Sequence, residues 1–153
     1  MQGQLIYLHG SKTATKTLTG SYVSSTPSVD VSGYEMLTLF ISYTPGVNSN
    51  PISLAPEWSI DGGSTWFSDT LNIPGTASGG AVSTVVAAQT YDFIGAATTT
   101  TYGLRMRFPV LENGFMNSYG SGILFRVKVK ETSGGAYGSC KVAASLQGHV
   151  TRG

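Results

Sequence analysis

The sequence predicts an all-β domain, an antiparallel β-sandwich of jelly-roll-like arrangement with about eight to ten short strands and little or no helix. Three observations support this fold class. Apolar residues recur with period two, stretches rich in glycine and proline separate the alternating segments, and no window shows the three-four apolar repeat of a helix. At 153 residues the chain fits one domain, and we assign residues 1–153 to it.

Three segments alternate most regularly and are predicted as half-buried strands. They span residues 36–43, 102–108 and 123–130, and the inner faces carry Leu37, Leu39, Ile41 and Tyr43, then Tyr102, Leu104, Met106 and Phe108, then Ile123, Phe125, Val127 and Val129. A further strand is expected near the end, with Val142, Ala144 and Leu146 inward. Weaker candidates cover 4–9, 15–23, 52–60, 65–71 and 82–94, and turns are expected at 44–51, 72–80 and 132–135.

Charge is scarce and unevenly distributed. Charged residues make up 11% of the chain, against about 25% in typical soluble domains, so we expect a partner to cover part of the surface. The net charge is +1, but residues 1–104 hold two cations and six anions, 2 − 6 = −4, and residues 105–153 hold seven cations and two anions, 7 − 2 = +5. The near-zero total argues against a nucleic-acid partner, and so does the lack of aromatics interleaved with the cations in the sequence.

The ends of the chain and its cysteine bear on location. Residues 1–8 lack the basic region and apolar run of a signal peptide, and no stretch reaches the ~18 to 20 apolar residues that span a membrane. The single cysteine, Cys140, excludes an intramolecular disulfide and is expected to begin the last strand as a small buried residue. We therefore expect a protein made in the cytoplasm, with no membrane partner.

The most distinctive local motif is Ser59-Ile60-Asp61-Gly62-Gly63-Ser64-Thr65-Trp66. It predicts a hairpin corner in which Asp61 accepts hydrogen bonds from amides of the turn, Gly62 and Gly63 take positive φ, and Trp66 folds back over the corner. With Ser59 these residues form the predicted structural hairpin. The motif resembles the Asp-box of sialidases and other propeller proteins, where it is a structural turn, and a ligand-contacting loop is the alternative.

The residues that could carry catalysis do not form a known constellation. His9 and His149 lie far apart in the sequence, and the segment 138–140 is not a nucleophile elbow. Glu57, Asp61 and Asp69 could form a calcium site or a glycosidase pair, but we favour the interpretation that they are solvated carboxylates of turns. The chain is therefore predicted not to be an enzyme, with no catalytic residues, cofactor or metal.

Two groups of residues are candidates for partner binding. Residues 1–11, with Leu5, Ile6, Tyr7 and Leu8, could form an extended N-terminal arm that adds a strand to a neighbour, or simply the first strand of the sandwich. The second group lies on the outward faces of two predicted strands, Arg105 and Arg107 on one and Arg126, Lys128 and Lys130 on the other. If those strands are neighbours they form one positive stripe, which could be a solvated face, a docking surface for an acidic protein or, as the weakest reading, a nucleic-acid site.

Across its length the chain resembles the small β-sandwich capsid decoration (cement) and head-accessory proteins of tailed bacteriophages. The Ser59–Trp66 hairpin, the charge-poor surface rich in serine, threonine and glycine, and the absence of a signal peptide carry the resemblance. It implies a virion structural protein on the capsid surface, a homotrimer that binds the major capsid protein or other shell subunits. The alternative is a carbohydrate-binding or receptor-binding module that uses exposed aromatics such as Trp66, Phe67, Tyr119 or Tyr137. A subunit of a non-viral shell or a pilus-like polymer is a third reading.

Overall fold

The computed structural model describes residues 5–25, 28–32, 34–47, 50–68, 70–74, 84–95, 98–107, 123–132 and 135–149. Within these residues every regular element is a β-strand, and no helix is present. Thirteen strands are distinguished, of which nine have four residues or more and four have two. The all-β class predicted from the sequence is therefore confirmed, and nine longer strands fall within the predicted range.

The first sheet is built around the two longest strands of the chain. It has the order β1-β13-β5-β11, and all of its pairings are antiparallel. Its strands are β1 (Ile6–His9), β13 (Ser139–His149), β5 (Tyr34–Thr44) and β11 (Thr100–Arg107), and the two-residue β2 (Lys16–Thr17) pairs with the start of β13.

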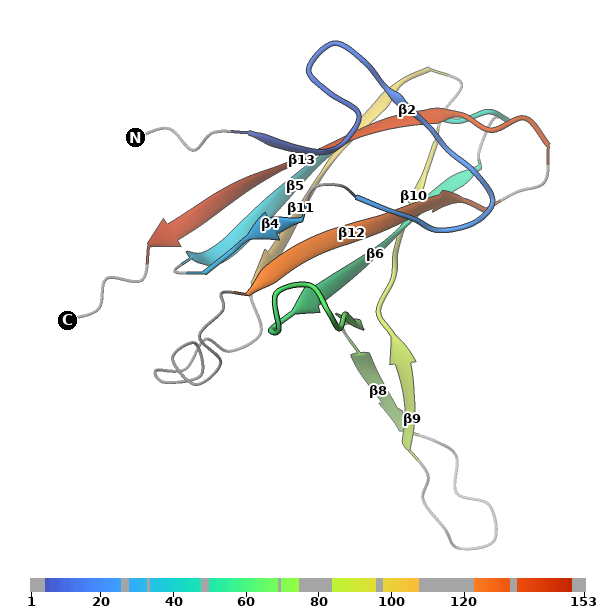
Figure 1. Cartoon of the computed structure of the whole chain (residues 1–153). Coiled ribbons are helices and arrows are strands. Elements are labelled where there is room, and N and C mark those ends of the chain that lie inside the picture. Colours follow the sequence, from blue (N-terminus) through green and yellow to red (C-terminus); the bar gives the residue numbers. More distant parts are fainter. Residues whose placement is uncertain are drawn as a thin grey trace, which may run out of the picture.

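The second sheet lies against the first, as Figure 1 shows, and has the order β10-β6-β12-β3. Its principal strands are β10 (Tyr91–Ile94), β6 (Pro51–Ser59) and β12 (Leu124–Glu131), joined by the two-residue strands β3 (Val23–Ser24), β4 (Val29–Asp30) and β7 (Phe67–Ser68). The remaining strands, β8 (Thr70–Pro74) and β9 (Thr84–Ala88), pair with each other in a separate two-stranded sheet. The predicted strands at 65–71 and 82–94 are thus each divided into two, and β8 extends into the predicted turn at 72–80.

The order of the strands identifies the topology. We count β3 and β4 as one interrupted strand and leave aside β2, β7 and the β8–β9 pair. Eight strands then remain, and the first sheet holds the first, eighth, third and sixth of them in that spatial order. The second sheet holds the fifth, fourth, seventh and second. Strands that alternate between two sheets in this way form the paired Greek keys of a jelly roll.

The core lies between the sheets and uses the faces that period two predicts. Leu37, Leu39, Ile41 and Tyr43 of β5 are buried, as are Phe125, Val127 and Val129 of β12 and Val142 and Ala144 of β13. Trp58 of β6 packs its ring 4.7 Å from that of Phe125. Of the predicted inner face of β11, Met106 is buried, Tyr102 and Leu104 are half-buried, and Phe108 lies outside the described residues.

A buried carboxylate closes one end of the sandwich. Glu131, the last residue of β12, is fully buried, and its Oε1 accepts hydrogen bonds from the Tyr43 hydroxyl at 3.0 Å and the Gly46 amide at 2.8 Å. Its Oε2 accepts one from the Gly138 amide at 2.5 Å. Burial acts to raise the pKa of Glu131, but these bonds outweigh it and hold the pKa below its ordinary value. The carboxylate therefore joins the β5–β6 turn to the β12–β13 turn through neutral donors.

Candidate interaction surfaces

The predicted partner-binding residues are divided between the two sheets. β1 and β11, which carry the N-terminal and Arg105 groups, belong to the first sheet, while Arg126, Lys128 and Lys130 lie on β12 of the second. The condition for one continuous positive stripe, adjacency of β11 and β12, is not met. Arg107 pairs with Met36 through the backbone, and its side chain lies outside the described residues.

The N-terminal segment is mostly an ordinary first strand. β1 pairs antiparallel with β13, with Tyr7 opposite Ala143 and a shift in register between Tyr7 and His9. Leu8 is buried in the core, so it cannot bind a partner, and Ile6 packs against the same cluster. Leu5 is exposed and Tyr7 half-buried, whereas residues 1–4 of the proposed arm lie outside the described residues. Of the two readings, the first strand of the sandwich describes residues 6–9.

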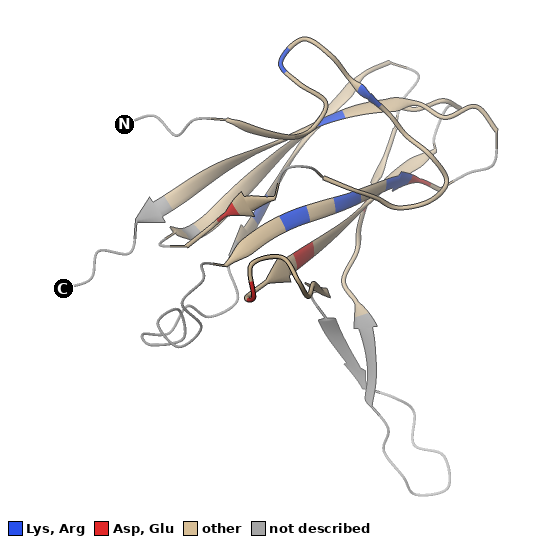
Figure 2. Ribbon diagram, in the orientation of Figure 1, with Lys and Arg blue, Asp and Glu red and all other residues tan. Residues whose placement is uncertain are grey.

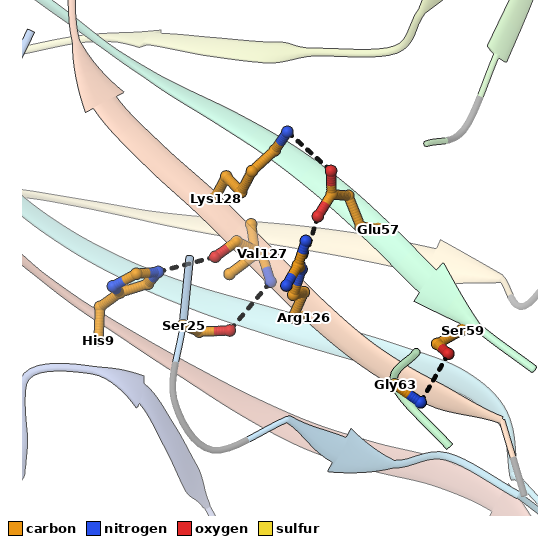
Figure 3. A network of polar contacts seen from close by, with 8 residues as sticks. All are labelled: His9, Ser25, Glu57, Ser59, Gly63, Arg126, Val127 and Lys128. Atoms are coloured by element: carbon orange, nitrogen blue, oxygen red, sulfur yellow. Dashed lines mark hydrogen bonds and ion pairs between the residues drawn. The ribbon is translucent and has the colours of Figure 1, made fainter. Parts of the chain in front are cut away.

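Figure 2 shows the basic residues of β12 alternating along the ribbon, next to an acidic residue of β6. Arg126 Nε lies 2.6 Å from Glu57 Oε2, and Lys128 Nζ lies 2.7 Å from Glu57 Oε1 (Figure 3). The side chain of Glu57 is 7% exposed, and those of Arg126 and Lys128 are 24% and 27% exposed. Burial acts to raise the pKa of Glu57, but the bonds from Lys128 and Arg126 outweigh it and lower the pKa. Two of the three cations are thus engaged by one carboxylate.

Aromatic rings cover the same cations, contrary to the expectation from the sequence. Arg126 lies 4.1 Å from the ring centroid of Trp66, and Lys130 and Lys128 lie 4.5 Å and 5.5 Å from that of Tyr22. The Tyr22 hydroxyl also hydrogen-bonds the Ser53 hydroxyl of β6 at 2.7 Å. Because the rings come from elements remote in sequence, the alternation within β12 gives no sign of them. We call Arg126, Lys128 and Lys130 the β12 cation row, and its contacts form a layer over the outer side of β6.

The Ser59–Trp66 hairpin takes the geometry that its residues predict. Asp61 Oδ1 accepts hydrogen bonds from the Ser59 hydroxyl and the Thr65 amide, both at 2.8 Å, and these bonds lower the pKa of Asp61. Gly62 and Gly63 have φ values of 71° and 91°. The Gly63 amide donates to Ser59 Oγ at 2.9 Å (Figure 3). The Asp61 carboxylate thus accepts hydrogen bonds from within its own turn, and one face of the Trp66 ring lies against the Arg126 guanidinium.

The outer face of the first sheet carries an exposed aromatic ring that the sequence analysis did not single out. Phe40 lies in the middle of β5 and is 47% exposed. Its cross-strand neighbours are Ala143 on β13 and Gly103 on β11, and Tyr7 of β1 lies beyond Ala143. A Cβ added at Gly103 would meet no atom within 4 Å. The alternation of β5 predicts that Phe40 points outward, but not that both neighbours are small.

The charges on this outer face all have the same sign within the described residues. Arg105 and Lys141 lie on it, and the intervening side chains are small or neutral, among them Thr38, Ser42, Thr101 and Ser145. Lys141 Nζ donates to the Lys12 carbonyl oxygen at 3.0 Å. The face is therefore sparsely charged and weakly basic, with Phe40 at its centre.

The buried ionisable groups are used in structural contacts. His9 Nε2 lies 2.8 Å from the Val127 carbonyl oxygen, and Glu131 is surrounded by donors from its two turns. Burial raises the pKa of the Cys140 thiol to about 12, and Cys140 lies buried near the start of β13, as predicted for a small structural cysteine. Among the described residues no group of three or more His, Cys, Asp or Glu side chains could hold a metal ion.

Comparison with known proteins does not place the chain in a family. No family model matches it, and neither the curated proteins nor the solved structures contain a match. In the part of the chain that the structure describes, no helix has the length and apolarity needed to cross a bilayer.

Proposed function

We propose that this chain is a non-enzymatic virion structural protein, a capsid decoration protein that binds the outside of an assembled shell and stabilises it. The observation that carries the proposal is Phe40, an exposed ring at the centre of a sparsely charged sheet face. Exposed aromatic rings among few charges are typical of protein-binding surfaces. The jelly-roll topology adds support by analogy alone, because viral capsid domains and lectins share it.

The use of the ionisable groups favours a non-enzymatic role. His9, Glu57 and Glu131 are each engaged by main-chain groups or by ion pairs within the fold. The β12 cation row is also poorly suited to nucleic acid, because Glu57 engages Arg126 and Lys128. Among the described strand residues of the first sheet, Phe40 is an exposed large apolar side chain, 47% accessible.

A carbohydrate-binding or receptor-binding module is the weaker alternative. It needs two or three aromatic rings along one shallow groove. Phe67 and Tyr137 are exposed, but Trp66 has Arg126 at 4.1 Å from its ring centroid, and Tyr119 lies outside the described residues. The guanidinium occupies a ring face that a sugar would need.

The proposed protein acts as a homotrimer on the virion surface, bound to the major capsid protein or to other shell subunits. A trimer multiplies a weak contact through avidity. Light scattering on a sizing column measures this directly, with about 48 kDa expected, three times the 16.0 kDa of one chain. A mass of 16.0 kDa would contradict the trimer.

Shell binding is tested by co-sedimentation. The purified chain is mixed with shells assembled from the major shell protein of the same genome, and the pelleted fraction is measured against chain concentration. We expect Phe40→Ser to weaken binding by about tenfold or more, since buried aromatic anchors dominate such interfaces. Phe67→Ser is the matched control, because Phe67 is exposed at 51% but lies on the second sheet. No pelleting of the wild type, or equal loss in both variants, would contradict the proposal.

A further inference from the structure

Within the described residues, β11 at the end of the first sheet has one long unpaired edge. β11 pairs with β5 through eight consecutive residues, from Thr100 opposite Tyr43 to Arg107 opposite Met36, without a shift in register. It ends the sheet order, so within the described residues no strand pairs with its other edge. Figure 1 shows β11 beside β5 in the sheet behind β12. Unpaired amides and carbonyls along such an edge can pair with another chain.

Apart from the two-stranded β8–β9 sheet, the other sheet edges in the described part of the chain are short or irregular. β1 has four residues and a register shift between Tyr7 and His9. β10 has four residues, and the opposite edge of its sheet is divided into β3 and β4, of two residues each. Short and bulged edges discourage pairing between molecules. β11 differs from them because it has eight residues, no bulge and no proline.

The inner face of β11 is incompletely covered. Tyr102 and Leu104 pair with Ile41 and Leu39, whose side chains are fully buried, yet both are only half-buried. The ring of Tyr102 lies 4.8 Å from that of Phe93 on β10, which packs against one side of it. A strand added to the edge of β11 would place alternate side chains beside Tyr102 and Leu104. Apolar residues at those positions would remove the remaining exposed surface from water.

The outer face of β11 indicates the charge of the partner. Arg105 is exposed and lies opposite the neutral Thr38, and the described outer face of this sheet carries Arg105 and Lys141 but no carboxylate. Opposite charges at facing positions of neighbouring strands stabilise pairing, and like charges oppose it. Gly103, with no atom near an added Cβ, leaves room for a close approach.

We infer that the free edge of β11 binds an extended segment of a partner protein in which apolar residues alternate with acidic ones. The segment adds a strand to the first sheet, with its apolar residues over Tyr102 and Leu104 and its acidic residues beside Arg105. The inference deepens the proposed function, on which it rests for the identity of the partner, because it states how a shell subunit would be held. The competing role of Arg105 is to repel other strands and so protect the edge.

The test uses two capped synthetic peptides of eight residues, one alternating valine with glutamate and the other valine with lysine. Binding to the isotope-labelled chain is followed by amide chemical shifts and by hydrogen exchange of the β11 amides. We expect the glutamate peptide to bind, with the shift and exchange changes centred on β11. The lysine peptide should bind at least about fivefold more weakly. Arg105→Glu should reverse this preference, whereas Lys141→Glu, on the same face but two strands away, should change the affinity by less than twofold.

Two results would overturn the inference: no binding of either peptide, or the same preference in the wild type and in Arg105→Glu. These results are distinguishable from failure of the proposed function. Shells that bind the chain while the peptides do not would refute strand addition and leave the Phe40 surface intact. Peptides that bind while shells do not would support strand addition and refute the capsid partner.

Discussion

The imidazole of His9 and the carbonyl of Val127 join the two sheets at their edge. His9 ends β1 of the first sheet, Val127 lies in β12 of the second, and the Nε2–O distance is 2.8 Å (Figure 3). The same carbonyl accepts the Ser25 amide at 3.0 Å, and the Val127 amide donates to Ser25 Oγ at 3.1 Å. Since a carbonyl oxygen can only accept, Nε2 of His9 donates this hydrogen bond.

The burial of His9 predicts a loss of stability in mildly acidic solution. Burial lowers the pKa of His9 from 6.5, the Val127 bond partly opposes this, and Lys16 lowers it further. In this pH range the unfolded chain therefore binds a proton that the folded chain does not bind. The free energy of unfolding falls as the pH drops below 6.5, by at most about 1.4 kcal/mol per pH unit. Urea unfolding between pH 7.5 and pH 5 measures it.

His9→Gln is the control for this effect. Its amide can donate to Val127 but does not titrate, so we expect a flatter pH dependence over the same window. The lowered pKa values of Glu57, Asp61 and Glu131 do not interfere, because a carboxylate with a depressed pKa loses its contribution only below its unfolded value, near pH 4.5 or lower. Equal slopes in the wild type and the variant would contradict the role of His9.

Removing the Glu131 carboxylate is expected to destabilise the fold strongly. Glu131→Ala leaves the amides of Gly46 and Gly138 and the hydroxyl of Tyr43 without this acceptor, at a cost of about 3 to 5 kcal/mol. Glu131→Gln keeps the volume but turns an amide donor toward these donors, so we expect a loss of about 2 kcal/mol or more. Denaturant unfolding checks both, with the exposed Thr13→Ala as control. A loss below about 1 kcal/mol in Glu131→Ala would refute this structural role.

The close approach of the two turns that Glu131 joins also explains why glycine occupies positions 46 and 138. A Cβ at Gly46 would lie 1.9 Å from the Ala136 carbonyl oxygen, and one at Gly138 would lie 1.9 Å from the Thr44 carbonyl oxygen. Both contacts are with backbone, which cannot move aside cheaply. The glycines therefore permit the close approach that brings their amides to the carboxylate.

The ion pairs of the β12 cation row are expected to be more strongly coupled than surface pairs. Glu57→Gln leaves Arg126 and Lys128 as two like charges on one face of the strand, and Lys128→Gln relieves that repulsion. A double-mutant cycle between Glu57 and Lys128 should give a coupling of about 1 kcal/mol or more, above the median for exposed pairs. A coupling near zero would show that the row is an ordinary solvated face, one of the alternatives that its alternation allows.

The alternation of single strands predicted the faces but not the neighbours. Leu37 to Tyr43 and Phe125 to Val129 are buried where period two places them, because a strand with one face in the core must alternate. That pattern carries no information on which strands pair. It could not show that β11 and β12 lie in different sheets, or that Lys130 lies over the ring of Tyr22. The sequence likewise shows no sign that Glu131 is buried, since its donors come from two turns that are far apart in the chain.

The most direct measurement of the central claim is the disruption temperature of the assembled shell, by calorimetry, with and without the chain. A protein that binds only the intact shell stabilises it by mass action, by about 2.7 kcal/mol per site at a hundredfold excess over Kd. We predict a higher disruption temperature with the wild type and with Phe67→Ser, and a clearly smaller increase with Phe40→Ser at the same chain concentration. An unchanged disruption temperature in the presence of saturating wild-type chain would contradict the account.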